Sequence, residues 1–270
     1  MGDANSSSQP SWPKGWVDTH IHLLPGLDDG PANMEAALAM AETAIADGTT
    51  HIIATSHANY QWSYQPERVA VLREQMQAAL GDRVRLASGC ELHLSFENVQ
   101  AALANPRLYS LNGSRYILCE FPEFFERASM GKALEDFRRL GLSPVLAHPE
   151  RNPVFQQHPN TLLEYLRLGC YAQVTASSFA GRFGKRAEQF SAEMLQRGWA
   201  HLIASDGHSA EQRAPRISRA YDFVEKEAGP ETAQALCSAN PMAVLLDEDL
   251  PFAPSLAESK RKGLWSRLRG

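Results

Sequence analysis

The chain has 270 residues, with 26 lysines and arginines against 31 aspartates and glutamates, so its formal charge at pH 7 is -5. This balance gives no overall electrostatic reason to expect a nucleic-acid partner, and we predict none. Four scattered cysteines without a CxxC pair favour reduced thiols and a cytoplasmic location. No segment approaches the roughly 20 apolar residues of a membrane-spanning helix, so we predict no transmembrane segment.

A chain of this length can bury a large core, so we expect a single folded domain. We predict a flexible extension over 1–15, the folded domain over 16–251, and a proline-rich linker with a short basic tail over 252–270. The sequence leaves the role of the tail and the oligomeric state open.

Seven short β-rich segments recur along the chain, with amphipathic segments between them, and several of the latter end in glycine, a usual helix stop. This alternation predicts an α/β fold with a parallel sheet, and seven similar units favour a closed or nearly closed barrel. The predicted strands cover 16–22, 50–57, 83–94, 115–121, 143–149, 171–177 and 200–208, and the predicted helices cover 33–48, 66–81, 129–141, 161–169 and 187–198.

Ionisable side chains stand at the carboxyl ends of these strands, where barrel enzymes carry their active sites. Side chains alternate along a strand, so His20 and His22 should project from the same face. Asp28 and Asp29 follow them in the next loop. The residues placed at this rim are His20, His22, His57, Glu91, Glu120, His148, Asp206 and His208.

Burying so many ionisable groups together would be costly without cations, which favours a multinuclear metal site. Imidazoles and carboxylates suit Mn, Fe or Zn better than Ca, and hydrolysis is the expected reaction class. Arg151 and Arg213 follow the fifth and seventh strands, and paired guanidinium hydrogen bonds suit phosphate oxygens. For Arg151, neutralising a neighbouring carboxylate such as Glu150 is an equal alternative.

The other histidines are predicted to lie apart from this site. His51 and His201 precede their strands and should lie at the opposite end of the barrel, and His158 should be a surface residue. His93 shares the face of Glu91 by two-residue periodicity, and whether it lines the pocket stays open. No cysteine has an arginine six positions later, and GxSxG and Walker patterns are absent, which closes those nucleophilic routes.

The motifs DTHIHLLPGLDDGP, ATSHAN, GCELHL, ILCEFP, VLAHPERN, QVTASSFAGRFG and ASDGHSAEQRAPR, in this order, resemble the PHP (polymerase and histidinol phosphatase) superfamily. Within it they are similar to the bacterial manganese-dependent tyrosine-protein phosphatases of capsule and exopolysaccharide synthesis, the CpsB-like group. The resemblance spans about residues 16–251. It implies a distorted (β/α)7 barrel of TIM-like type that binds three metal ions, most often Mn.

The resemblance also implies roles for individual residues, and hydrolysis of phosphotyrosine by a metal-activated water. The substrate implied is a phosphotyrosine protein, namely a bacterial tyrosine kinase with a tyrosine-rich tail. Arg151 and Arg213 would bind the phosphate, and Asp28 would orient a ligand from behind. The implied ligand sets are His20, His22, Glu91 and Asp206 for one metal, Glu91, Glu120 and His148 for a second, and Asp29, His57 and His208 for the third.

The chain departs from many relatives in the segment SHANYQWSY, where Tyr60, Trp62 and Tyr64 are aromatic. These rings either shape the substrate rim or pack within their loop. Two rival functions stay open. One is another PHP phosphoesterase, acting on histidinol phosphate, another small phosphomonoester or a nucleic-acid end, and the other is a non-catalytic regulator of polysaccharide assembly.

Overall fold

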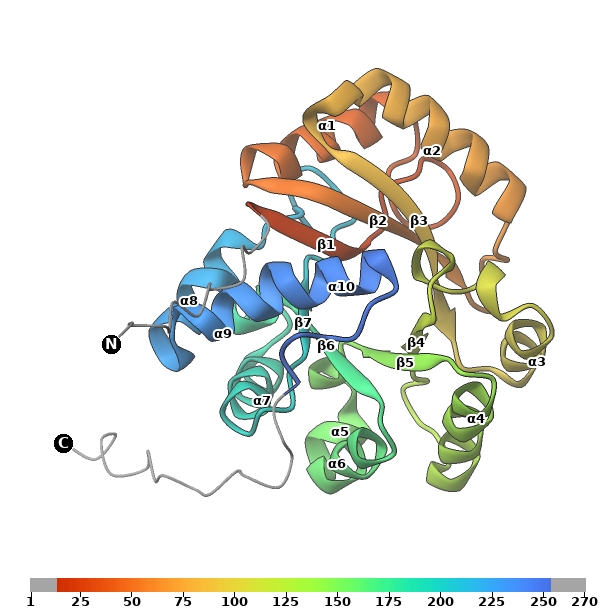
Figure 1. Ribbon diagram of the computed structural model, residues 1–270, viewed down its shortest axis with the longest axis vertical. Coiled ribbons are helices and arrows are strands. Elements are labelled where there is room, and N and C mark those ends of the chain that lie inside the picture. Colours follow the sequence, from red (N-terminus) through yellow and green to blue (C-terminus); the bar gives the residue numbers. More distant parts are fainter. Residues whose placement is uncertain (1–13, 254–270) are drawn as a thin grey trace, which may run out of the picture.

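The computed structural model describes residues 14–253, which form one parallel seven-stranded sheet (Figure 1). The strands follow one another in chain order from β1 to β7, as the alternation of strands and helices predicted. Their bounds are β1 (Trp16–Ile21), β2 (Thr49–Ala58), β3 (Arg85–His93), β4 (Tyr116–Glu120), β5 (Ser143–Ala147), β6 (Tyr171–Thr175) and β7 (Leu202–Ala204).

The first and last strands nearly close the barrel. They meet at their carboxyl ends, but they do not form a continuous ladder. Ile21 forms an isolated parallel bridge with Gly207. The amide of His22 donates to the carbonyl of Gly207 at 2.9 Å, and the amide of Asp206 donates to the carbonyl of His20 at 2.8 Å. These contacts form a seam between β1 and β7, which holds the loop after β1 against the segment after β7.

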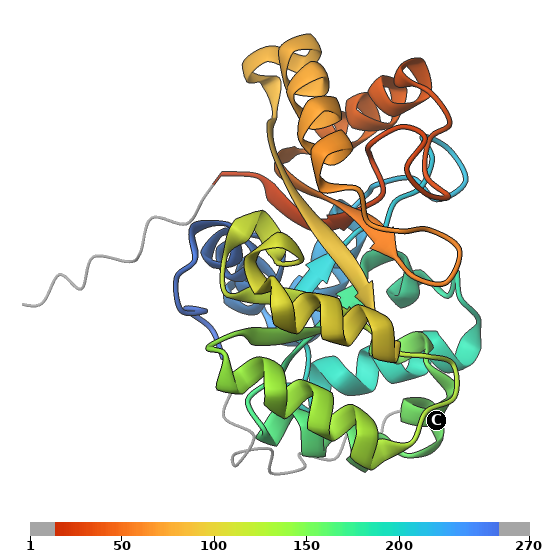
Figure 2. The same cartoon turned by 90° about the vertical axis from the view of Figure 1, so that its right-hand side faces the viewer.

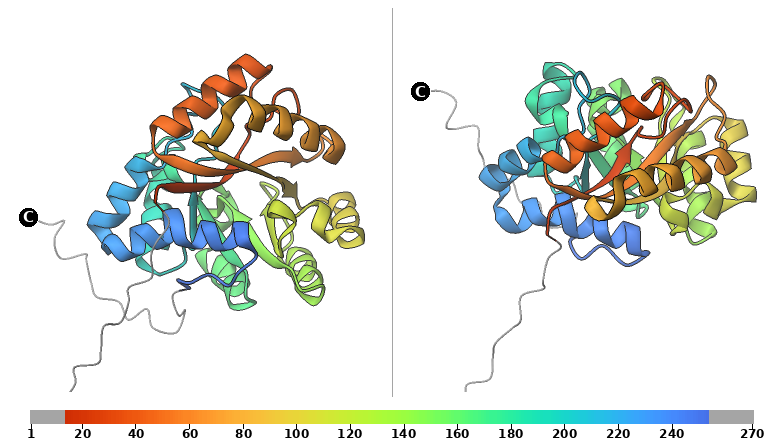
Figure 3. Two further views of the ribbon diagram at one scale, coloured as in Figure 1. Left: turned by 45° about the horizontal axis from the view of Figure 1, so that its top comes forward. Right: turned by 90° about the horizontal axis from the view of Figure 1, so that it is seen from above.

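Helices surround the strands, and Figures 2 and 3 show α1 and α2 together on the outer side of β1, β2 and β3. The five predicted helices are all present: α1 and α2 lie within two residues of their expected bounds, and α4, α6 and α7 each begin and end two residues earlier than predicted. The predictions had no counterpart for α3 or α5. The helices before β7 are α1 (Met34–Ala46), α2 (Pro66–Leu80), α3 (Phe96–Ala104), α4 (Arg127–Arg139), α5 (Pro153–Gln157), α6 (Pro159–Arg167) and α7 (Lys185–Gln196).

The loop from β1 to α1 is held by a close backbone approach and a helix cap. A Cβ atom on Gly30 would lie 2.4 Å from the carbonyl oxygen of His22, so only glycine fits there. Asn33 then caps α1 by accepting a hydrogen bond from the amide of Ala36 at 3.0 Å. The sequence therefore folds Asp28 and Asp29 back over the end of β1.

The C-terminal helical segment, to which the sequence assigned no element, closes the amino end of the barrel. It comprises α8 (Ser218–Ala228), α9 (Pro230–Gln234), a π-helical turn (Ala235–Ala239) and α10 (Asn240–Leu246). Asn240 donates to the carbonyl of His201, just before β7, at 2.8 Å. Val244 belongs to the same buried hydrophobic cluster as Leu118 of β4 and Val145 of β5. The prolines at 230 and 241 divide the stretch into short helices that periodicity alone does not reveal.

The seventh strand is shorter than predicted. Sequence placed it over 200–208, but the extended ladder ends at Ala204. Asp206 has a left-handed backbone with φ 49°, which turns the chain out of the strand. None of the helices in residues 14–253 has the length and apolar character of a bilayer-spanning segment. The predicted extension and basic tail lie mostly outside the described residues, so the domain boundaries stay predictions.

Candidate metal centre

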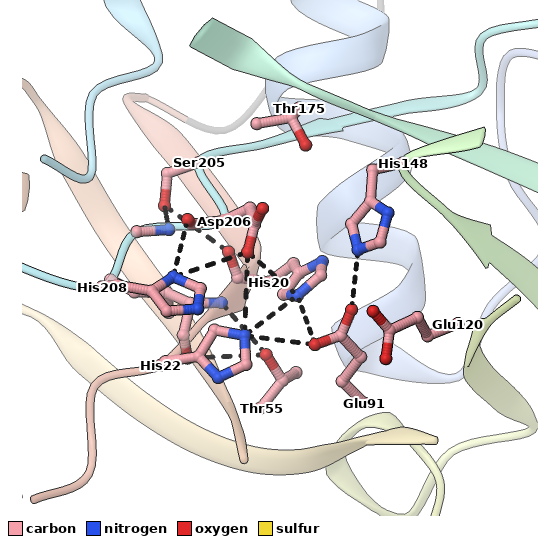
Figure 4. A network of polar contacts seen from close by, with 12 residues as sticks. His20, His22, Thr55, Glu91, Glu120, His148, Thr175, Ser205, Asp206 and His208 are labelled. Carbon is pink, nitrogen blue, oxygen red and sulfur yellow. Dashed lines mark hydrogen bonds and ion pairs between the residues drawn. The ribbon is translucent and has the colours of Figure 1, made fainter. Parts of the chain in front are cut away.

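The nine predicted ligands meet at the carboxyl end of the barrel, and Figure 4 shows most of them around Glu91. They come from the ends of six strands and from the loop after β1. Burial is high for all but two of them: Glu120 is intermediate, and the Asp29 side chain is 40% exposed. The set is His20, His22 and Asp29 from β1 and its loop, His57 from β2, Glu91 from β3, Glu120 from β4, His148 after β5, and Asp206 and His208 after β7.

Glu91 is the centre of this cluster. Its Oε2 lies 3.3 Å from His20 Nε2, 3.2 Å from His22 Nε2 and 3.0 Å from His57 Nδ1. The oxygen is buried, yet it has no hydrogen bond with acceptable geometry among the described residues. Ligand atoms that share an ion at about 2.1 Å lie roughly 3 Å apart, so this convergence fits a metal and not a hydrogen-bonded core.

Three groups of side chains have donor atoms close enough to share an ion, with all atoms in a group within 4.8 Å of one another. Glu91 belongs to two of the groups, and so do His22 and His57. His148 lies outside them, but its Nε2 is 2.8 Å from Glu91 Oε1. The groups are His20, His22 and Glu91; His57, Glu91 and Glu120; and His22, Asp29, His57 and His208.

Asp28 and Gln173 orient the imidazoles from outside the cluster. Asp28 Oδ2 lies 2.9 Å from His22 Nδ1 and also accepts from the amide of His57 at 3.0 Å. Gln173 Oε1 lies 2.7 Å from His20 Nδ1. Such partners fix the ring orientation and leave the other nitrogen free for a metal. Sequence analysis anticipated Asp28 and missed Gln173, although a polar side chain amid the apolar residues of its strand was a usable signal.

Neighbouring carboxylates hold two of the imidazoles, His22 and His57, in their charged form. Burial lowers the pKa of His57, but Glu91, Asp29 and Glu120 outweigh burial and raise this pKa to about 11. Burial likewise opposes protonation of His22, and Asp28 and Glu91 raise its pKa to about 9. Protons on these imidazoles would have to leave before the same nitrogens could bind a metal.

The carboxylates divide into two kinds. Burial and the nearby Glu91 raise the pKa of Glu120 to about 7. Burial acts in the same direction on Asp206, but Arg151, His20 and Arg213 outweigh it and hold the pKa of Asp206 well below its usual value. Asp206 is therefore ionised at neutral pH, whereas Glu120 is partly protonated there.

Two of these residues have strained backbones. His148 has φ 34° and Asp206 has φ 49°, in the left-handed region that only a few per cent of non-glycine residues adopt, although aspartate and histidine enter it more often than most. Both residues directly follow the strands β5 and β7 or their continuations. Left-handed residues of this kind are concentrated at functional sites, where the surrounding structure maintains the strain.

Arg151 and Arg213 meet at the carboxylate of Asp206, at the mouth of the cluster. Arg151 forms a short ion pair with it, and Arg213 Nη2 lies 2.7 Å from its Oδ2. Both guanidinium groups also face the ring of Phe183, at 4.3 and 5.9 Å from its centroid. Glu150, the partner considered from sequence, instead accepts from the Thr175 amide and the Ser178 hydroxyl.

His51, His158 and His201 lie outside the metal cluster, as the sequence predicted. His51 lies near the start of β2, His201 is buried just before β7, and His158 is exposed. His93 is half-buried at the end of β3, with its ring edge-on to Tyr60 at 6.1 Å. This contact places it beside the rim, next to the metal cluster.

The aromatic residues of the β2–α2 loop have three different environments. Trp62 stacks on His57, with ring centroids 5.6 Å apart and an interplanar angle of 10°. Tyr64 packs against the hydrophobic core. Tyr60 is 86% exposed. Tyr64 is therefore packed, as one of the two interpretations held, whereas a role of Tyr60 or Trp62 at the substrate rim stays a prediction.

Known proteins share both the sequence and the fold. Residues 16–246 match the family described as "Capsular polysaccharide synthesis, CpsB/CapC". Tyrosine-protein phosphatase YwqE of Bacillus subtilis is 31% identical over 250 residues, which cover 91% of this chain and 98% of YwqE. Tyrosine-protein phosphatase CpsB of Streptococcus pneumoniae is 28% identical, over 86% of this chain and 99% of CpsB.

A crystal structure from work on YwqE and CpsB, described there as unique metal-dependent tyrosine phosphatases, matches with a TM-score of 0.81 and 32% identity. The match covers 87% of this chain and 96% of that one. A β-aspartyl dipeptidase of Fervidobacterium islandicum, with a TM-score of 0.55 and 14% identity, shares the fold alone. The match over nearly the whole length of both chains places this protein in the CpsB/CapC family.

Proposed function

We propose that this protein is a metal-dependent protein-tyrosine phosphatase that hydrolyses phosphotyrosine in a protein substrate. The main support is one observation: nine imidazole and carboxylate side chains and two arginines converge at one end of the barrel. Both the ligand types and the relatives' names agree with it. The reaction is hydrolysis of a phosphoric monoester.

We propose three metal ions, with Mn as the most suitable ion and Fe or Zn as alternatives. The donor set consists of imidazole nitrogens and carboxylate oxygens, without thiolates, which suits these ions. When bound, the ions would supply a nucleophilic hydroxide at neutral pH and neutralise charge on the phosphate. The residues that would hold them are His20, His22, Asp29, His57, Glu91, Glu120, His148, Asp206 and His208.

Arg151 and Arg213 would bind the phosphate group. Each guanidinium has five N–H donors and uses only some of them on Asp206, and Nε of Arg213 has no acceptor among the described residues. The donors left over can hold non-bridging phosphate oxygens and stabilise the charge that develops on them. The shared contact with Asp206 and Phe183 keeps both groups in place before substrate arrives.

The chemistry of the leaving group favours phosphotyrosine as the substrate. A phenol has a pKa near 10, so it departs as phenolate more readily than an alkyl alcohol and depends less on a general acid. We propose that the substrate is a tyrosine kinase with a tyrosine-rich tail, in keeping with the family's description in capsular polysaccharide synthesis. A cytoplasmic location is supported by four buried, unpaired cysteines.

The direct test is phosphate release from a phosphotyrosine peptide by metal-stripped protein, with and without added Mn²⁺. The matched control is the double variant His20→Ala/His22→Ala, which removes two donors of one ligand group. We expect release that depends on Mn²⁺ and is lost in the double variant. A panel with histidinol phosphate and single-stranded DNA separates the rival phosphoesterase functions. Absence of release under any metal from folded protein would overturn the proposal.

A further inference from the structure

Three exposed aromatic side chains stand on successive loops of the catalytic end of the barrel. Tyr60, Phe96 and Phe124 are 86%, 75% and 74% exposed, and we call them the aromatic rim. They follow β2, β3 and β4, the strands that carry His57, Glu91 and Glu120. The other large apolar side chains exposed in residues 14–253 are aliphatic, and none lies in these loops.

Hydrogen bonds join the bases of these loops to one another. Asn98, in the first turn after Phe96, donates its side-chain amide to the carbonyls of Ala58 at 2.7 Å and His93 at 3.1 Å. The ring of Tyr60 also contacts His93. The loops after β2 and β3 therefore form one continuous surface beside the metal ligands.

The loop after β4 continues this surface toward the arginines. Phe125 packs against Phe121 and Phe155, with ring centroids 5.0 and 5.4 Å away, which anchors the loop while the neighbouring Phe124 points outward. Asn152 donates to the carbonyl of Pro122 at 2.8 Å and directly follows Arg151. The loops that bear the aromatic rim are thus joined to one another after β2 and β3, and the loop after β4 is joined to the residue that follows Arg151.

The shape and position of the rim favour a chain over a small molecule. A phosphotyrosine ring that reaches the metal ligands occupies the centre of the barrel end and leaves the rim uncovered. A peptide of six extended residues spans roughly 20 Å, so residues on either side of the phosphotyrosine reach the loops around the site. Aromatic rings held by packed loops bind such residues at low entropic cost.

The charges beside the rim select among peptides. Glu97 follows Phe96 and Glu123 precedes Phe124, and both carboxylates are exposed. Neither forms an ion pair with any other residue in the described range. Two free carboxylates flanking aromatic rings favour lysine and arginine in the bound chain and disfavour acidic residues.

We propose that the aromatic rim binds the polypeptide on either side of the phosphotyrosine, through its apolar or aromatic side chains, with lysine or arginine side chains against Glu97 and Glu123. This inference rests on the proposed phosphatase function and deepens it, because it defines the substrate as a polypeptide of stated chemistry. The rim then contributes to selectivity, while the metal ligands and arginines perform the reaction.

The experiment measures kcat/KM of the full-length protein with Mn²⁺ for three substrates: free phosphotyrosine, a phosphotyrosine peptide flanked by phenylalanine and lysine, and the same peptide flanked by serine and glutamate. The rim variant is Tyr60→Ser/Phe96→Ser/Phe124→Ser. The matched control, Val71→Ser/Leu140→Ser/Leu168→Ser, removes three exposed apolar side chains elsewhere on the surface. The readout is the ratio of kcat/KM for each peptide to that for free phosphotyrosine.

We expect the ratio for the apolar and basic peptide to fall about tenfold in the rim variant and to stay at the wild-type value in the control. In Glu97→Lys/Glu123→Lys, the preference between the two peptides should reverse. Unchanged ratios in both variants would overturn the inference. So would a change from dimer to monomer in the rim variant with an unchanged ratio, since the rim would then bind a second copy of the chain.

The same data distinguish this inference from the proposed function. If wild-type protein hydrolyses all three substrates and the rim variants have the same ratios as wild type, the phosphatase function stands and the substrate-binding role of the aromatic rim is refuted. Wild-type protein that hydrolyses none of them refutes both. If the triple variant does not fold, the charge-reversal variant gives the answer, because Glu97 and Glu123 are exposed surface residues.

Discussion

The side-chain oxygen of Gln173 lies 2.7 Å from Nδ1 of His20, and both side chains are buried. The amide nitrogen of Gln173 in turn donates to the hydroxyl of Thr19 at 3.0 Å. Because the facing atom is an acceptor, Nδ1 of His20 carries the hydrogen. Its Nε2 is therefore free to face Glu91 and Asp206 as a ligand.

Replacing Gln173 with alanine should weaken metal binding without removing a ligand. Loss of such an orienting partner typically costs about 10- to 100-fold in affinity. Equilibrium dialysis against Mn²⁺ measures the effect, and Gln173→Glu, which keeps an acceptor, should restore most of it. Gln100→Ala, on an exposed face of α3, is the control. Wild-type affinity in Gln173→Ala would show that the contact does not position His20.

Metal binding should release protons at pH 7. The carboxylates around His22 and His57 outweigh burial and raise their pKa values to about 9 and 11, so both imidazoles are protonated before a metal binds. Protons and metal compete for the same nitrogens, so affinity should fall as pH falls from 8 to 6. Calorimetry of Mn²⁺ binding in two buffers of different ionisation enthalpy counts the protons.

The control for this titration is His158→Ala, because His158 is exposed and belongs to none of the three ligand groups. It should release the same number of protons as wild type. His57→Ala should release fewer. Metal binding that is independent of both buffer and pH would contradict the assignment of these imidazoles as ligands.

Substitution of either arginine should reduce turnover while the metals remain bound. Arg151→Ala and Arg213→Ala each remove donors from the mouth of the site, and loss of one such charge-stabilising donor typically costs about 10²- to 10³-fold in kcat. Metal content by elemental analysis should equal that of wild type. Lysine at either position should rescue only in part, because it lacks the planar fork that reaches Asp206 and phosphate together.

Arg186→Ala provides the matched control, since this arginine is exposed on α7. Its kcat/KM for a phosphotyrosine peptide should equal that of wild type. Unchanged turnover in both Arg151→Ala and Arg213→Ala would defeat the phosphate-binding role.

Asp47 should contribute to stability by capping a helix distant in sequence. Its carboxylate accepts hydrogen bonds from the amides of Ile217 and Ser218 at 2.7 and 2.9 Å, and from the Ser218 hydroxyl at 2.6 Å. The first turn of α8 has no cap from Ile217 itself. Asp47→Ala should lower the free energy of unfolding by about 1–2 kcal/mol, measured by urea denaturation.

The comparison is Glu42→Ala. Glu42 lies near the end of α1, the helix that Asp47 directly follows, and it forms an exposed ion pair with Arg83. Its effect should be much smaller, because exposed ion pairs contribute little. Equal destabilisation by the two substitutions would contradict the capping role of Asp47.

The sequence was sufficient to predict the seven strands and the end of the barrel at which the ionisable side chains meet. Hydrophobic periodicity is local, so runs such as 50–57 and 171–177 identify strands without knowledge of their neighbours. Because parallel strands place their carboxyl ends together, the position of His57 or Glu91 at a strand end also predicted which side chains would meet. The family resemblance added the number of metals and the substrate, which periodicity cannot provide.

Only the tertiary structure decided the contacts between units far apart in the chain. Asp206, and not the adjacent Glu150, pairs with Arg151, because the left-handed turn after β7 brings it across the site while Glu150 is turned toward β6. The seam between β1 and β7 and the helices that close the amino end arise from packing, which no local pattern encodes. Sequence therefore predicted which side chains converge at this end of the barrel, apart from Gln173, and closure of the barrel determined which of them touch.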